Sequence, residues 1–133
     1  MDETRLDTPA AIDEHLTRVL TRADRARYGV RFVLCDRDNR VRVHCPVDAP
    51  PPFADGDGPR GTVAAFAATL AGEPPGGGVL MVLTRPGSGA VSASDRAWFH
   101  ATYEVCRAAR VRVLGVYLVT PADLREILLD DAL

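Results

Sequence analysis

The fold of this chain is indicated most clearly by the segment Val79-Leu-Met-Val-Leu-Thr-Arg-Pro-Gly-Ser-Gly-Ala-Val-Ser-Ala-Ser-Asp95. It begins with an uninterrupted apolar run, Val79 to Leu83, which is typical of a central strand buried on both faces of a sheet. A glycine-rich loop follows, and Ser92 or Ser94 can cap a helix from about residue 93 to 109. The segment therefore predicts a strand, a tight loop and a helix at the centre of an α/β fold.

Further strands are predicted on either side of this segment. Residues 29–45 predict an antiparallel hairpin, because β-branched residues and period-two alternation flank the turn formers Asp36 to Asn39. A second central strand is predicted at 111–119. The fold class expected is α/β (α+β), with a mixed sheet that contains an N-terminal antiparallel hairpin and two central strands, flanked by helices.

Capping patterns predict the helices at both ends. Thr8-Pro9 favours the start of an N-terminal helix at about 8–25, since threonine caps free amides and proline suits the first helical position. Thr120-Pro121 repeats the pattern and predicts a C-terminal helix at about 121–130. An alanine-rich helix is expected at 62–71. The proline-rich stretch between Pro46 and Gly61 is expected to be a long loop.

Composition limits the class of protein. The chain has 133 residues, 47% of them hydrophobic, which fits a single domain spanning 1–133. A net charge of -2 provides no basic field for nucleic acid or an anionic membrane. The N-terminus does not resemble a secretory signal, so a cytoplasmic location without membrane contact is expected. The three cysteines are expected to be reduced and mostly buried.

The order of these elements and the residues at their joints resemble the RadC-like branch of the JAB/MPN (JAMM) family of zinc-dependent isopeptidase-like domains. The hairpin from Phe32 to Val41 is similar to the family's first hairpin, and Leu83 to Asp95 is similar to its metal loop. That loop reads His-x-His-Pro-Ser-Gly, a short spacer and Ser-x-x-Asp in the family. The resemblance covers roughly residues 8–119 and implies a JAB/MPN (cytidine-deaminase-like) fold.

The chain departs from the family at the residues that hold and use zinc. Ser92-Ala-Ser-Asp95 matches the last part of the loop, but the histidine positions fall on Val82 to Arg85, where nothing can ligate zinc. The segment where the catalytic glutamate is expected reads Arg27-Tyr-Gly-Val-Arg31. The resemblance therefore implies a degenerate, non-catalytic member, for which we expect no metal, no cofactor and no catalytic residues.

The loop has two structural interpretations. In the first, the guanidinium of Arg85 replaces the lost cation, pairs with Asp95 and bonds Ser92. In the second, Arg85 is a solvated loop residue and Asp95 only favours the positive end of the helix dipole. If the loop binds a small anion, its candidate ligand-binding residues are Arg85, Ser88, Ser92, Asp95 and His100. The histidines His15 and His44 are expected to be surface or packing residues.

Three functions follow from these observations. The first is a non-catalytic protein-binding or scaffold module that forms a homodimer and has an unknown protein partner, as metal-free members of the fold imply. The second is an enzyme or small-anion-binding protein that uses the vestigial metal cleft around Arg85 and Asp95. The third, a nucleic-acid-associated accessory protein, rests on the family's link to DNA repair, and the net charge argues against it.

Overall fold

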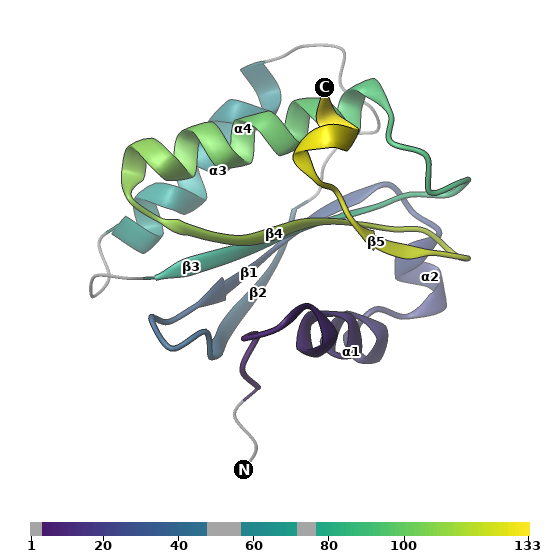
Figure 1. The fold of residues 1–133 in the computed structure, drawn as a ribbon, viewed down its shortest axis with the longest axis horizontal. Helices are drawn as coiled ribbons and strands as arrows, with labels where there is room; N and C mark the ends of the chain where they lie inside the picture. The colour runs from purple at the N-terminus through teal and green to yellow at the C-terminus, as the bar shows by residue number, and fades with distance from the viewer. Residues whose placement is uncertain (1–3, 48–56, 72–76) are drawn as a thin grey trace.

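A single mixed sheet of five strands, in the order β2-β1-β3-β4-β5, forms the centre of the molecule (Figure 1). The computed structural model describes residues 4–47, 57–71 and 77–133. In chain order the elements are α1 (Pro9–Val19), α2 (Arg22–Arg25), β1 (Gly29–Cys35), β2 (Val41–Val47), α3 (Asp57–Ala71), β3 (Gly78–Thr84), α4 (Ala93–Ala109), β4 (Arg112–Val119), β5 (Leu124–Glu126) and the 3-10 turn η1 (Leu129–Ala132).

The predicted hairpin and central strands are present. β1 pairs antiparallel with both β2 and β3, whereas β3 and β4 run parallel. Parallel neighbours need a crossover connection, and α4 supplies it. All seven residues of β3 are buried, as expected for a strand covered on both faces. The predicted α/β class, with a mixed sheet and flanking helices, is confirmed.

Helices cover the two faces of the sheet separately: α1 lies on one side, and α3 and α4 lie on the other (Figure 1). Successive residues of a strand point to opposite faces, so β3 contributes to both cores. Met81 packs on the α3 and α4 side, and Leu80 packs on the α1 side. Trp98 and Phe99 of α4 are 3% and 5% exposed, which makes them core residues.

The predicted N-terminal helix at about 8–25 is two helices, separated by a break at Leu20 and Thr21. α1 ends at Val19, and the next residue, Leu20, is extended with φ of -92° and ψ of 119°. Thr21 then starts the separate helix α2, because its hydroxyl accepts from the backbone of Asp24 while the Asp24 carboxylate accepts from the backbone of Thr21. This reciprocal capping offers the backbone partners that a continuing helix would have supplied.

The predicted C-terminal helix at 121–130 is wrong. The amides of Thr120 and Asp123 donate to each other's carbonyls at 2.9 and 3.3 Å, which closes a turn instead of a helix start. The chain then returns as β5, pairing antiparallel with β4, and ends in η1. Ile127, directly after β5, is buried, whereas the next residue, Leu128, is 55% exposed.

The predicted loop between Pro46 and Gly61 is wrong at both of its ends, because the neighbouring strand and helix extend into it. β2 extends through Val47, and α3 begins at Asp57 instead of Thr62. The rest of that loop lies outside the described residues. No helix in the described ranges is long and apolar enough to cross a membrane.

The three cysteines are free, as expected. In the hairpin Cys45 lies opposite Phe32, whereas Cys35 lies opposite Val41. The two thiols are therefore out of register, and the hairpin gives them no disulfide geometry.

Candidate functional site

The loop between β3 and α4 contains the residues singled out from the sequence. It leaves the sheet at the carboxyl end of β3, where Thr84 lies opposite Val119 and the amide of Arg85 donates to the Val119 carbonyl at 3.4 Å. Gly87 has a φ of +98°, a conformation that glycine adopts without steric cost. The loop therefore turns sharply and brings residues 85–90 against the start of α4.

Ser92, not Ser94, begins α4. Its hydroxyl accepts from the amide of Asp95 at 3.1 Å, and the Asp95 carboxylate accepts from the amide of Ser92 at 2.8 Å. This capping box satisfies two amides at the helix start and places a negative charge at the positive end of the helix dipole. The sequence pattern Ser-x-x-Asp thus has a local structural role.

Arg85, which is partly buried, and Asp95, which is buried, form an ion pair. Nη2 of Arg85 lies 2.9 Å from Oδ2 of Asp95, and Nε lies 3.5 Å from Oδ1. The side chains are 14% and 6% exposed. Of the two interpretations of this loop, the solvated arginine is therefore wrong. Arg85 does not bond Ser92 directly within the described structure, but both residues share the Asp95 carboxylate.

The remaining donors of Arg85 bind the loop backbone. Nη1 donates to the carbonyls of Ser88 at 2.9 Å and Pro86 at 3.5 Å, and Nη2 donates to the carbonyl of Ala90 at 2.5 Å. A guanidinium has five N–H donors, and these three contacts with the two to Asp95 make five. Arg85 therefore acts as a cross-link that folds the loop around its own side chain.

The outside of the loop is also held in place. The guanidinium of Arg125 lies 3.4 Å from the Gly89 carbonyl and 2.7 Å from the carboxylate of Asp131. A side chain at Gly89 would clash with the carboxylate of Asp123. β5 and the turn before it therefore pack closely against the loop.

Two predicted site residues do not present free side chains to a ligand at this position. The hydroxyl of Ser88 lies 3.3 Å from the amide of Ala90, and only the Ser88 carbonyl contacts Arg85. Nε2 of His100 lies 2.8 Å from the carbonyl of Ala132, so this histidine binds the C-terminal turn η1. The structure brings together Arg85, Ser92 and Asp95 but leaves His100 apart from them.

The composition of the site does not suit a metal. Zinc, the metal of the family that the sequence resembles, needs three or more imidazole, thiolate or carboxylate ligands. Within the described residues, no such group of three side chains occurs. At the predicted loop, the carboxylate that would remain as a ligand is already bound by a guanidinium and a backbone amide.

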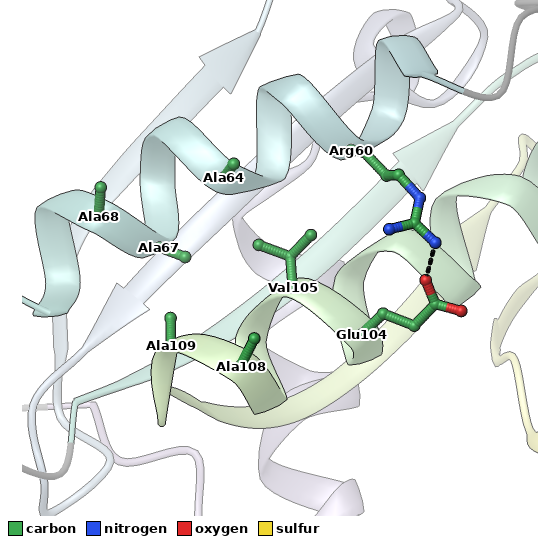
Figure 2. Close-up of a pocket in the computed structure, with 8 residues that line it drawn as sticks. All are labelled: Arg60, Ala64, Ala67, Ala68, Glu104, Val105, Ala108 and Ala109. Atoms are coloured by element: carbon green, nitrogen blue, oxygen red, sulfur yellow. Dashed lines mark hydrogen bonds and ion pairs between the residues drawn. The ribbon is translucent and has the colours of Figure 1, made fainter.

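A separate hollow lies between α3 and α4 (Figure 2). It has a volume of about 400 Å³, and Arg60 and Glu104 form an ion pair at one end. None of the predicted site residues lines it. The sequence predicted an alanine-rich helix at 62–71, but nothing in it indicated that a second helix would lie beside this one. The lining residues are Arg60, Ala64, Ala67, Ala68, Glu104, Val105, Ala108 and Ala109.

One contact between titratable side chains was not foreseen. His15 of α1 and His44 of β2 lie with their Nε2 atoms 3.0 Å apart. They are far apart in the sequence, and only the packing of α1 beneath the hairpin brings them together. Period-two alternation along β2 puts His44 on one face of the hairpin, but alternation alone does not show that a helix covers that face.

Comparison with known proteins found no family model, no curated protein and no solved structure that matches this chain.

Proposed function

We propose that this chain is a degenerate RadC-like JAB/MPN domain in which an arginine replaces the metal, and that it acts as a non-catalytic protein-binding or scaffold module. The order of helix, hairpin, helix, strand, helix and strand supports the proposal, as does a loop with Ser92 and Asp95 in the family's Ser-x-x-Asp spacing. The finer assignment of the sheet to the JAB/MPN (cytidine-deaminase-like) fold is part of the same proposal.

The observation that carries the proposal is the set of contacts made by Arg85. A zinc ion in this family neutralises the loop aspartate and ties the loop together. In this chain a guanidinium does both, because it pairs with Asp95 and binds three loop carbonyls. A cationic side chain at this position also repels a divalent cation. In this proposal the contacts of Arg85 take the place of the metal in holding the loop.

The alternative of a small-anion site has weaker support. An anion at this loop would need free N–H donors from Arg85 or from the start of α4. The guanidinium donors already have protein acceptors, and Asp95 occupies the helix start with a negative charge. An enzyme that uses this cleft would first have to break the Arg85–Asp95 pair.

Metal analysis tests the first half of the proposal. Purified protein should contain no stoichiometric zinc by mass spectrometry, and adding Zn²⁺ should leave the melting temperature unchanged, since a ligand that binds only the folded state raises it. Inorganic phosphate serves as the matched probe for the anion alternative and should also have no effect. A zinc content of one per chain, or a phosphate-dependent rise in melting temperature that Arg85→Ala abolishes, would contradict the proposal.

Self-association tests the second half. A scaffold module that forms a homodimer should show a concentration-dependent molecular mass in sedimentation equilibrium. Duplex DNA is added as a control for the accessory-protein alternative, whose binding should weaken steeply with salt. A chain that stays monomeric at every concentration and binds DNA in a salt-dependent manner would replace the scaffold function with the third one.

A further inference from the structure

His15 and His44 form a direct contact between a helix and an edge strand. His15 lies on α1 and His44 on β2, the first strand of the sheet order, and their Nε2 atoms are 3.0 Å apart. The ring centroids are 5.0 Å apart, and the rings are tilted by 33°. His15 is 5% exposed, although it is a polar residue. The contact joins the N-terminal helix to the edge of the sheet.

Arg18 fixes the positions of the protons in this pair. Its Nη2 atom lies 3.4 Å from Nδ1 of His15, and because a guanidinium can only donate, Nδ1 accepts. The proton of neutral His15 then lies on Nε2 and is donated to Nε2 of His44. The proton of His44 lies on its Nδ1. Donation therefore runs from Arg18 through His15 to His44, with both imidazoles neutral.

We propose that this contact is a pH-sensitive latch: acidification protonates the histidine pair, separates the rings and releases α1 from β2. A proton added to Nε2 of His44 would place two N–H donors opposite each other. A proton added to Nδ1 of His15 would occupy the nitrogen that accepts from Arg18. Protonation of either histidine therefore breaks one of the two hydrogen bonds, from Arg18 to His15 or from His15 to His44.

The charged groups around the pair oppose protonation. Arg18 faces His15 from α1 and also reaches the hydroxyl of Thr4 at 3.4 Å. Arg31 acts on His44 from β1 and is itself paired with Asp24 of α2 at 3.0 Å. Burial, His44 and Arg18 together lower the pKa of His15 from 6.5 to about 4. Burial and Arg31 also lower the pKa of His44.

These directions define the pH window of the latch. Because the pKa of His15 is lower in the folded chain than in an unfolded one, its contribution to stability is fully present above about pH 6.5 and is lost as the pH falls towards about 4. Within that window, each proton taken up on release raises the equilibrium constant for release by up to about tenfold per pH unit. Ile12 and Leu16 hold α1 on the sheet by apolar contacts that do not titrate, so it is the histidine contact that makes the release of α1 depend on pH.

Two measurements on the full chain test the latch. The first is NMR titration of the imidazole nitrogens, which should give a midpoint of about 4 for His15 and below 6.5 for His44. At neutral pH the spectra should show the proton of His15 on Nε2 and that of His44 on Nδ1. The second is amide hydrogen exchange, corrected for the intrinsic rate. Protection across α1 should fall between about pH 7 and about pH 4.5, before the central strands lose theirs.

Matched variants separate the latch from general acid unfolding. The double variant His15→Gln with His44→Gln retains polar side chains that do not titrate, so α1 protection should become independent of pH in this window. His100→Gln is the control, because this histidine binds the C-terminal turn instead. Midpoints near 6.5 for both His15 and His44, or α1 protection that is unchanged by acid in the wild type, would overturn the proposal. If the double variant does not fold, the wild-type titration alone decides.

Discussion

Nη2 of Arg85 lies 2.9 Å from Oδ2 of Asp95, and this pair joins the loop after β3 to the first turn of α4. The two residues are ten positions apart, and each also contacts the backbone of the segment between them. The ion pair therefore holds a closed loop at the carboxyl end of a central strand. Its contribution to stability can be measured directly.

Replacing Arg85 by alanine should strongly destabilise the chain. The substitution leaves the buried Asp95 carboxylate without its cationic partner, and losing one member of a buried pair typically costs about 3–5 kcal/mol. Arg107→Ala, an exposed arginine on α4, is the matched control and should change the free energy of unfolding by less than about 0.5 kcal/mol. Urea denaturation gives both values, and equal effects of the two substitutions would show that the pair has no structural role.

Ser92→Ala should cost about 1 kcal/mol of stability, because Ser92 is the N-cap of α4 and its hydroxyl accepts from the amide of Asp95. Ser94→Ala is the control, since this serine lies inside the first turn, where alanine has the higher helix propensity. Thermal unfolding of the two variants checks the assignment. A larger loss of stability for Ser94→Ala than for Ser92→Ala would contradict the assignment of Ser92 as the N-cap.

Two glycine-to-alanine substitutions should have opposite effects. A Cβ atom at Gly115 would lie 2.9 Å from the ring of Tyr117, at a register shift in β4, so Gly115→Ala should cost about 1–3 kcal/mol. Gly61 lies inside α3 with nothing within 4 Å of an added Cβ atom, so Gly61→Ala should stabilise the chain by about 0.5–1 kcal/mol. Chemical denaturation measures both, and a neutral Gly115→Ala would contradict the close packing of this strand.

The three thiols should differ in reactivity. Burial raises the pKa of Cys35 to about 12, with Asp36 adding to the shift, and burial raises the pKa of Cys106 to about 11. Both thiols are therefore protonated and inaccessible near neutral pH, whereas Cys45 is half-buried. Brief alkylation followed by peptide mass spectrometry should label Cys45 first, and denaturant should equalise the three. Early labelling of Cys35 in the native chain would be the contrary result.

The central elements were predictable because their signals are local. The apolar run from Val79 to Leu83, the period-two alternation of the hairpin and the Ser-x-x-Asp capping pattern each act through neighbouring residues. The ion pair between Arg85 and Asp95 was one of two interpretations of the loop, because the resemblance to the family's metal loop puts Arg85 at a ligand position and Asp95 at that of the acidic ligand. Burial of the pair then excluded the solvated alternative.

The ends of the chain were predicted less well because long-range contacts override local propensity there. Thr120-Pro121 carries the same capping signal as Thr8-Pro9, yet only the latter starts a helix. After Thr120 the free edge of β4 is available, and pairing with it satisfies the backbone of β5. Whether a strand edge is free for pairing cannot be read from the sequence. The sequence therefore could not distinguish Thr120-Pro121 from Thr8-Pro9.

The amino-acid sequence by itself determined the class of fold, the central strand and loop, and the absence of zinc-ligating histidines at the loop, because these depend on composition and on neighbouring residues. Tertiary structure alone decided that five donors of Arg85 close the loop, that β5 replaces a helix, and that His15 meets His44 across 29 positions. Each of these depends on segments that are brought together by burial of apolar surface. No single segment of the sequence determines that packing.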